Sequence, residues 1–218
     1  MPLTLHRADL IRSANFIDGQ WSATQATLDV TDPANFAPSN VLWEYFSTTD
    51  RDLGFMLGRP VLATMNDGTR VVVVGNGYNS TNGRAVLYIL DLATGAVIRK
   101  FDTLAGSDNG MATPGLFDSN NDGLMDVIYS GDLKGNLWKF DVSSSSTASW
   151  SIANGGLPIF VASDSAGKPQ PITAPITVAI NSVSTDINFT KRFVFFGTGS
   201  YFQTVDPTNV DTQTWYSV

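Results

Sequence analysis

Residues 59–95 read RPVLATMNDGTRVVVVGNGYNSTNGRAVLYILDLATG, and this stretch decides the fold. A proline opens a short first strand, and an Asn-Asp-Gly turn then reverses the chain. The apolar run 71–74 ends at Gly75, a residue that allows close approach of a neighbouring backbone. A third apolar strand covers 85–90, and 97–101 forms a fourth after a Thr-Gly turn. Because the central runs are apolar throughout, we expect strands buried on both faces.

The same order of signals recurs twice further along the chain. A second unit begins at Pro114 and passes through an Asn-Asn-Asp-Gly turn to apolar stretches at 127–130 and 136–142. A third unit begins at Pro175 and continues with the run 192–196. The prolines recur at intervals of roughly 55–60 residues, which is typical of propeller blades with loop insertions.

We therefore predict an all-β, quinoprotein-like fold: a partial β-propeller of about three to four blades of antiparallel strands. Closed propellers have roughly four to eight blades, so the chain is expected to be a fragment of a larger protein, forming one partial domain over 1–218. The blade-like units are predicted at residues 22–46, 59–102, 112–142 and 172–218.

Composition limits the possible functions. The net charge of −7 and the pI near 4.4 argue against a nucleic-acid partner, because an acidic surface repels phosphates. The absence of cysteine excludes disulfides, thiolate metal sites and cysteine nucleophiles. No apolar run approaches the roughly 18 residues that cross a bilayer, so no membrane span is expected. Charges interrupt residues 1–15, and an export signal is therefore not expected within this chain.

One loop has the pattern of a calcium site. From Asp118 to Asp126 the chain reads DSNNDGLMD, with oxygen-bearing side chains at loop positions 1, 3, 5 and 9 and glycine at position 6. Calcium takes about six to eight hard oxygen ligands on a flexible loop, and this spacing wraps such ligands around one point. The predicted ligands are the side chains of Asp118, Asn120, Asp122 and Asp126 and the backbone carbonyl of Leu124.

The alternative interpretation of this loop is a solvated acidic turn, since Asp, Asn and Gly are ordinary turn residues. The shorter Asn66-Asp67-Gly68 segment in the preceding unit is interpreted as such a plain turn. A transition-metal site is not expected, because it would require His or Cys and His6 is the only histidine.

Catalytic motifs are missing from the sequence. It contains no Gly-x-Ser-x-Gly elbow and no Walker loop, and neither Gly-x-Gly segment precedes a helical pattern. The carboxylate pair Asp50/Asp52 is interpreted as a solvated loop rather than an acid–base pair. Trp43 and Trp138 lie in apolar strands and are expected in the core between blades rather than in a sugar or quinone site. We therefore predict a protein that is not an enzyme.

The stretch 131–141, GDLKGNLWKFD, follows the acidic loop directly and resembles the carboxy-terminal propeller of the PilY1/PilC family of type IV pilus proteins. Further similar stretches are GNGYNS at 75–80, LDLATG at 90–95, LDVTDP at 28–33 and GTGSYF at 197–202, in the family's order. The Leu-Asp-x-x-Thr-Gly motif on its own also fits quinoprotein propellers.

This resemblance implies a calcium-binding propeller segment of an exported pilus assembly and tip-adhesin protein. Such proteins are located at the pilus tip or outer surface, support pilus biogenesis, oppose retraction and act in adhesion. The expected partners are pilus components such as minor pilins, together with host surface or matrix. In the family, calcium in the propeller loop is thought to switch between extension and retraction, and Asp118, Asn120, Asp122, Leu124 and Asp126 match that loop.

Two other functions stay open from the residues alone. One is a quinoprotein dehydrogenase that uses pyrroloquinoline quinone, although such enzymes often carry vicinal cysteines that this chain lacks. The other is a purely structural interaction propeller whose acidic loop holds no metal.

Overall fold

The computed structural model describes residues 16–17, 20–21, 24–28 and 40–218. Over these residues the sheets are antiparallel, and the helical segments are single 3-10 turns, so the predicted all-β class is confirmed. Residues 1–15 and 29–39 lie outside the described residues, and with them His6 and most of the 28–33 stretch.

Four sheets follow one another along the chain, and we name them blades I to IV. Blade I pairs β3 (Thr24–Leu28) with β4 (Val41–Phe46). Blade II contains β5 (Val61–Thr64), β6 (Arg70–Gly75), β7 (Val86–Asp91) and β8 (Val97–Asp102). Blade III contains β9 (Gly115–Phe117), β10 (Val127–Gly131), β11 (Asn136–Asp141), β12 (Ser151–Ile152) and β13 (Phe160–Val161). Blade IV contains β14 (Thr177–Ile180), β15 (Arg192–Gly197) and β16 (Trp215–Ser217).

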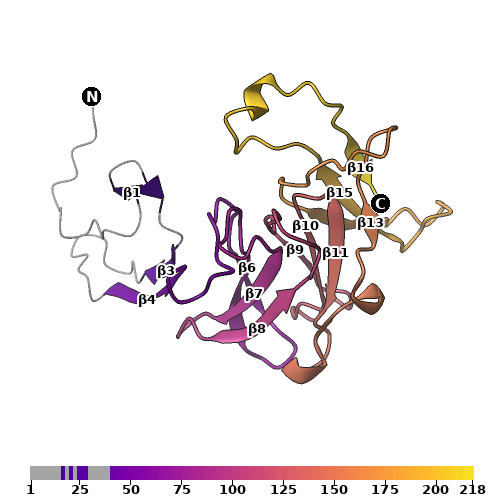
Figure 1. Cartoon of the computed structure of the whole chain (residues 1–218). Coiled ribbons are helices and arrows are strands. Elements are labelled where there is room, and N and C mark those ends of the chain that lie inside the picture. The colour runs from indigo at the N-terminus through magenta and orange to yellow at the C-terminus, as the bar shows by residue number, and fades with distance from the viewer. Residues whose placement is uncertain (1–15, 18–19, 22–23, 29–39) are drawn as a thin grey trace, which may run out of the picture.

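Shorter elements complete the described part of the chain. A hairpin of β1 (Phe16–Ile17) and β2 (Gln20–Trp21) precedes blade I. The 3-10 turns are η4 (Thr147–Ser149), η5 (Asn154–Gly156) and η6 (Asp206–Thr208). Figure 1 shows blade II, in magenta, beside the orange strands of blade III, with blade IV beyond it.

Blade II has the strand order β5-β6-β7-β8, each strand antiparallel to the next. The four valines of β6 are all buried, as expected from a run without polar residues. Val71 and Val73 point to the side of blade III, whereas Val72 and Val74 pack with Trp43 of blade I. A strand alternates its side chains between faces, so an all-apolar strand joins two neighbouring blades.

Blade III extends beyond the predicted limit at residue 142. After the serine-rich loop the chain returns to the sheet, and both β12 and β13 pair with β11. Trp150, which is 1% exposed, anchors this return in the core, and its Nε1 donates to the carbonyl of Ser144 at 2.7 Å. Strands of two residues carry no periodicity, which explains why the sequence did not indicate them.

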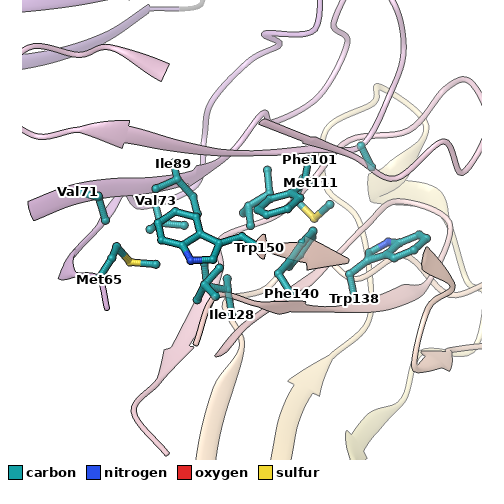
Figure 2. Packing of buried hydrophobic residues seen from close by; sticks show 13 residues of the cluster. Met65, Val71, Val73, Ile89, Phe101, Met111, Ile128, Trp138, Phe140 and Trp150 are labelled. Carbon is teal, nitrogen blue, oxygen red and sulfur yellow. The ribbon is translucent and has the colours of Figure 1, made fainter. Parts of the chain in front are cut away.

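The cores lie between the blades. Figure 2 shows the largest cluster, where Val73 and Ile89 of blade II meet Ile128 and Phe140 of blade III around Trp150. A second cluster joins blades III and IV, with Tyr129 and Phe196 among its members. Apolar burial between blades, at about 25 cal/mol per Å², is thus what holds consecutive sheets together.

Trp43 is a main contact of blade I with blade II, beside Tyr45, whose ring lies 5.7 Å from that of Tyr88. The Nε1 of Trp43 donates to the carbonyl of Leu92 at 2.9 Å, and its ring lies on Gly95. A Cβ at Gly95 would clash with that ring, and the residue has a φ of 71°. Glycine is therefore required in this turn for both space and conformation.

Buried polar residues follow the glycines that end β6 and β10. Asn76 is fully buried, and its Oδ1 accepts from the backbone of Val86 in its own blade and of Met111 in the connection to blade III. Asp132, also fully buried, accepts from Trp138 Nε1 at 2.9 Å and from Asn109 Nδ2 at 3.0 Å. These side chains satisfy backbone and side-chain donors where successive blades converge.

Candidate metal-binding loop

The acidic loop connects two strands of blade III. It begins at Asp118, directly after β9, and ends at Asp126, directly before β10. The strands are held in antiparallel register by pairs such as Val127↔Phe117. The first and last candidate ligands are therefore fixed to adjacent strands, and the residues between them form an excursion beyond the sheet.

Asp118 organises the first half of the loop. Its Oδ1 accepts from the backbone N–H groups of residues 120, 121 and 122 at 3.2, 2.7 and 3.3 Å. Its Oδ2 accepts from Gly123 N–H at 2.7 Å. Burial would raise the pKa of this carboxyl, but the four backbone donors hold it below its usual range. The side chain is thus ionised and points into the turn at neutral pH.

Asn120 and Asp122 continue the turn. Asn120 Oδ1 accepts from Asp122 N–H at 3.0 Å, and its Nδ2 donates to Asp122 Oδ2 at 2.9 Å. Asp122 Oδ1 accepts from Leu124 N–H at 2.8 Å. Gly123 has a φ of 87°, in the left-handed region that favours glycine, which agrees with the sharp turn expected at loop position 6.

Asp126 differs from the other carboxylates of the loop because it is buried, with 6% of the residue exposed. Its Oδ2 accepts from Ser119 N–H at 2.8 Å, which ties the end of the loop to its beginning. Its Oδ1 accepts from Asn66 Nδ2 at 3.1 Å. This hold by a residue of another blade was not predicted from the sequence.

The arrangement fits a calcium ion by its donor chemistry. Three carboxylates, one amide oxygen and a backbone carbonyl are the hard oxygens that calcium prefers, and they lie on one short hydrogen-bonded loop. Nevertheless, no group of three His, Cys, Asp or Glu side chains is assembled for a metal among the described residues. The carboxylates instead accept from backbone and amide N–H groups. Asp122 and Asp126 each accept one hydrogen bond per oxygen, which leaves lone pairs that a cation can use.

Asn66 is the residue that the sequence interpretation missed. The Asn66-Asp67-Gly68 segment does form the turn between β5 and β6, where Asp67 Oδ1 accepts from Thr69 N–H at 2.9 Å. Asn66 itself contacts the acidic loop of the next blade, so the segment is more than a plain turn. The only signal was its place in the repeat, where it corresponds to the acidic loop of the following unit.

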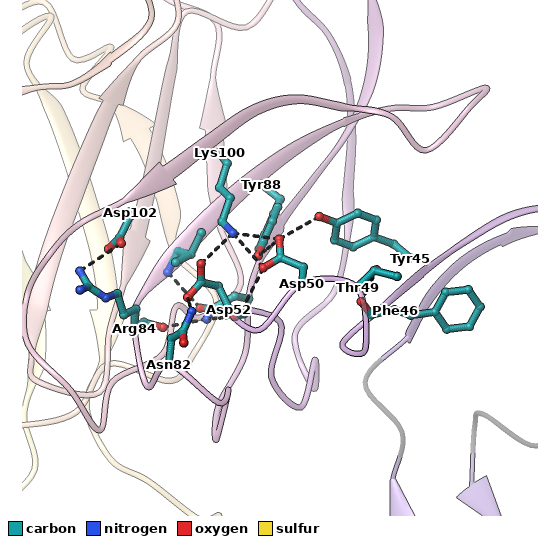
Figure 3. Close-up of polar contacts among 12 residues, drawn as sticks. Tyr45, Phe46, Thr49, Asp50, Asp52, Asn82, Arg84, Tyr88, Lys100 and Asp102 are labelled. Atoms are coloured by element: carbon teal, nitrogen blue, oxygen red, sulfur yellow. Dashed lines mark hydrogen bonds and ion pairs between the residues drawn. The ribbon is translucent and has the colours of Figure 1, made fainter.

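The Asp50/Asp52 pair is not a solvated loop, contrary to expectation. Lys100 Nζ lies 2.8 Å from Asp50 Oδ1 and 2.7 Å from Asp52 Oδ2, and the two carboxylate side chains are only 13% and 14% exposed (Figure 3). The hydroxyls of Tyr45 and Tyr88 both donate to Asp50 Oδ2 at 2.9 Å. This cluster ties the connection after β4 to blade II.

The electrostatics of this cluster follow from its contacts. Burial would raise the pKa of Asp50, but hydrogen bonds from Lys100 and its other partners hold it below its usual value of 3.8. Burial and the hydrogen bond to Asp50 raise the pKa of Tyr88. A carboxylate that stays charged between a lysine and two phenols is a structural anchor rather than a proton donor or acceptor poised near neutral pH.

The prediction that the two tryptophans in apolar strands lie in the core between blades is confirmed. Trp43 and Trp138 are buried in the contacts between blades, at 9% and 2% exposure. Trp150 is also buried, whereas Trp215 of blade IV is 67% exposed. Three of these four rings are therefore core residues.

Within the described residues, no helix has the length and apolar character needed to cross a membrane.

Comparison with known proteins matches nearly the whole chain to one family. A family model described as the PilY1 β-propeller domain matches residues 22–218. A type IV pilus biogenesis factor PilY1 homolog of Xylella fastidiosa is 37% identical over 230 residues, covering 93% of this chain and 15% of the relative. The type IV pilus biogenesis factor PilY1 of Pseudomonas aeruginosa is 39% identical over 197 residues, covering 82% of this chain and 16% of the relative.

A solved structure gives the same result for the fold. The PilY1 C-terminal domain of Pseudomonas aeruginosa matches with a TM-score of 0.79 at 36% identity, covering 93% of this chain and 46% of that chain. The propeller architecture predicted from the repeats is thus confirmed, and this chain spans less than half of the solved domain. Together, the family model, the relatives and the solved structure show that the chain belongs to the PilY1 β-propeller family of type IV pilus biogenesis factors.

Proposed function

We propose that this chain is a calcium-binding part of the propeller of a type IV pilus biogenesis factor. The observation that carries the proposal is the loop from Asp118 to Asp126, which arranges hard oxygen donors between two paired strands of blade III. The ligands would be the side chains of Asp118, Asn120, Asp122 and Asp126 and the carbonyl of Leu124.

The charges and hydrogen bonds of the loop residues determine how calcium binding would affect the stability of the chain. When bound, calcium would supply the positive charge that offsets three carboxylates. Without a cation, Asp118 and Asp122 hold the turn through hydrogen bonds from backbone N–H groups and from the Asn120 amide, and their negative charges repel each other and Asp126. Because a cation that binds only the folded loop stabilises the folded state, calcium is expected to raise the melting temperature.

At the level of the whole protein, we propose roles in pilus biogenesis, control of retraction and adhesion. The support is the family, whose curated relatives are named type IV pilus biogenesis factors. The proposed partners are pilus components such as minor pilins, together with host surface or matrix. The proposed location is extracellular or at the cell surface, and the role is non-catalytic.

Calcium titration by calorimetry into the metal-free chain tests the metal proposal. The parent chain is expected to bind one calcium ion in the micromolar range of sensor-type loops and to melt at a higher temperature when it is loaded. Asp126→Ala should weaken binding by at least about a hundredfold, since it removes a ligand outright. Asp122→Ala serves as a second variant, because the side chain of this exposed residue contacts only neighbours in its own loop.

The matched control for these variants is Asp67→Ala, which removes an aspartate from the corresponding turn of blade II. It should leave calcium affinity unchanged. A folded parent chain that shows no binding heat and no change in melting temperature would contradict the calcium proposal.

A metal-free structural propeller is the second candidate. It is favoured by the contacts of Asp118, whose two oxygens already accept from four backbone N–H groups. In that case the hydrogen bonds within the loop hold the turn without a metal. The melting temperature of the chain is then expected to be the same in calcium as in chelator.

A further inference from the structure

Asn66 reaches from blade II into the end of the acidic loop in blade III. Its Nδ2 donates to the carbonyl of Met125 at 3.0 Å, to Asp126 Oδ1 at 3.1 Å and, more weakly, to the carbonyl of Val142 at 3.4 Å. One amide group thus contacts Asp126, which is the last candidate ligand, together with Met125 before it and Val142, the first residue after β11. No other side chain from a different blade donates to the loop among the hydrogen bonds of the described residues.

The backbone reinforces this contact. Met125 N–H donates to the carbonyl of Thr64 at 3.0 Å, and Met65 forms a parallel bridge with Met125. Met65 is fully buried in the cluster that joins the two blades. The end of the acidic loop is therefore part of the contact between blades II and III, and not only of its own sheet.

The two halves of the loop differ in how they are held. Residues 120–123 are exposed, and their hydrogen bonds stay within the loop. Asp126 is buried and is fixed by Asn66 on one oxygen and by Ser119 N–H on the other. A cation bound by both halves would link an exposed turn to a carboxylate whose position depends on the neighbouring blade.

We propose that Asn66 is a positioning residue for the metal loop, and that through it calcium occupancy is coupled to the contact between blades II and III. This inference rests on the calcium-binding function proposed above. Asn66 is not a ligand in this scheme. It holds the carboxylate of Asp126 in one rotamer, and such partners of metal ligands typically change metal affinity by about 10- to 100-fold.

Coupling of this kind works in both directions. If Asn66 makes calcium bind more tightly, calcium must strengthen the Asn66 contact by the same factor. Calcium should therefore slow hydrogen exchange at the amide of Met125, which donates across the contact between the blades to Thr64. Without Asn66 this protection should be smaller, even where the loop is still occupied.

The test compares Asn66→Ala with Asn82→Ala in the 218-residue chain. Asn82 is a matched control because its Nδ2 also donates to a carboxylate, Asp52 Oδ1 at 2.6 Å, away from the acidic loop. Calcium chloride is titrated into each metal-free protein by calorimetry, and melting temperature verifies folding. We expect Asn66→Ala to bind about tenfold more weakly than the parent, with Asn82→Ala unchanged in affinity. Asn66→Ser keeps a small polar side chain and replaces Asn66→Ala if that variant is unfolded.

The outcomes separate the inference from the function on which it rests. Two results would overturn the positioning role and leave calcium binding intact. One is a calcium affinity of Asn66→Ala equal to that of the parent. The other is that calcium slows exchange at the Met125 amide as much in Asn66→Ala as in the parent. A parent chain that binds no calcium would overturn both. A loss of affinity in Asn82→Ala as large as in Asn66→Ala would show a general effect of destabilisation, and would also reject the specific role of Asn66.

Discussion

At the scale of single residues, polar side chains act where the chain passes from one blade to the next. Asn76 and Asp132 are fully buried and bind donors from their own and neighbouring segments, whereas Asp50 binds a lysine and two tyrosines. Asn66 acts as a donor instead, and its amide binds Asp126 of the acidic loop. Such groups contribute little net stability when they are satisfied, but removing one partner leaves the others buried and unpaired. They therefore fix how blades are placed relative to each other.

Asp50 gives a prediction with a defined pH window. Its folded pKa lies below the usual 3.8, so its charge stabilises the folded chain above that pH, and this contribution is lost as the pH falls through the lowered folded value. Asp50→Asn, which removes the charge opposite Lys100, should cost about 1–2 kcal/mol in the free energy of unfolding at neutral pH. The cost should shrink below about pH 4.

Urea unfolding of the parent and Asp50→Asn between pH 3 and 7 measures this difference. Asp67→Ala, an exposed carboxylate in a turn, is the control and should show a small effect throughout. A cost for Asp50→Asn that stays constant down to pH 3 would contradict the assigned role of the ionised carboxylate.

At the scale of elements, hydrophobic runs decide which segments the sequence can predict. Strands β6 and β7 follow directly from continuous apolar stretches, and their faces belong to different clusters. Strands β12 and β13 have two residues each and depend on contacts with β11 that local sequence does not encode. Asn66 and Asp126 are 60 residues apart in the sequence. Local turn chemistry therefore predicts the turn that contains Asn66, but not the contact of Asn66 with Asp126.

Trp150 is the residue that makes the extension of blade III stable. It follows η4, immediately precedes β12 and is buried among residues of blades II and III. Trp150→Ala should cost about 3–5 kcal/mol in the free energy of unfolding, because it leaves a large cavity and the carbonyl of Ser144 loses its donor. Trp150→Phe should recover a large part of that loss.

Urea denaturation measures both Trp150 variants, with Trp215→Ala as the control at an exposed tryptophan. An unfolding free energy of Trp150→Ala within 1 kcal/mol of the parent, approximately the effect of a surface change, would show that the return of the chain to β11 is not required for the core.

At the scale of the whole molecule, the blades differ in how completely they are covered. Blade II contributes one face to the cluster with blade I and the other to the cluster with blade III. Val194 and Phe196 of β15 pack one face of blade IV on blade III. Side chains alternate along a strand, so the residues next to these two in β15 lie on the opposite face of blade IV. There Phe195 stacks on Trp215 with ring centroids 5.4 Å apart. Within the described residues, no further cluster covers this face.

An aromatic row on one face of a sheet is expected to bind another apolar surface. The rings of Phe193 and Phe195 also stack, at 6.3 Å between centroids, so the row is continuous along β15 and onto β16. Because exposed apolar patches drive association, we expect the 218-residue chain to self-associate at about 100 µM, as measured by sedimentation velocity. The double variant Phe195→Thr, Trp215→Ser should stay monomeric, whereas Leu62→Ser, at a 65% exposed leucine of blade II, should not change association. Equal association of all three proteins would show that the chains associate through another surface. A monomeric parent would show that the stacked aromatic row does not need a partner surface in water.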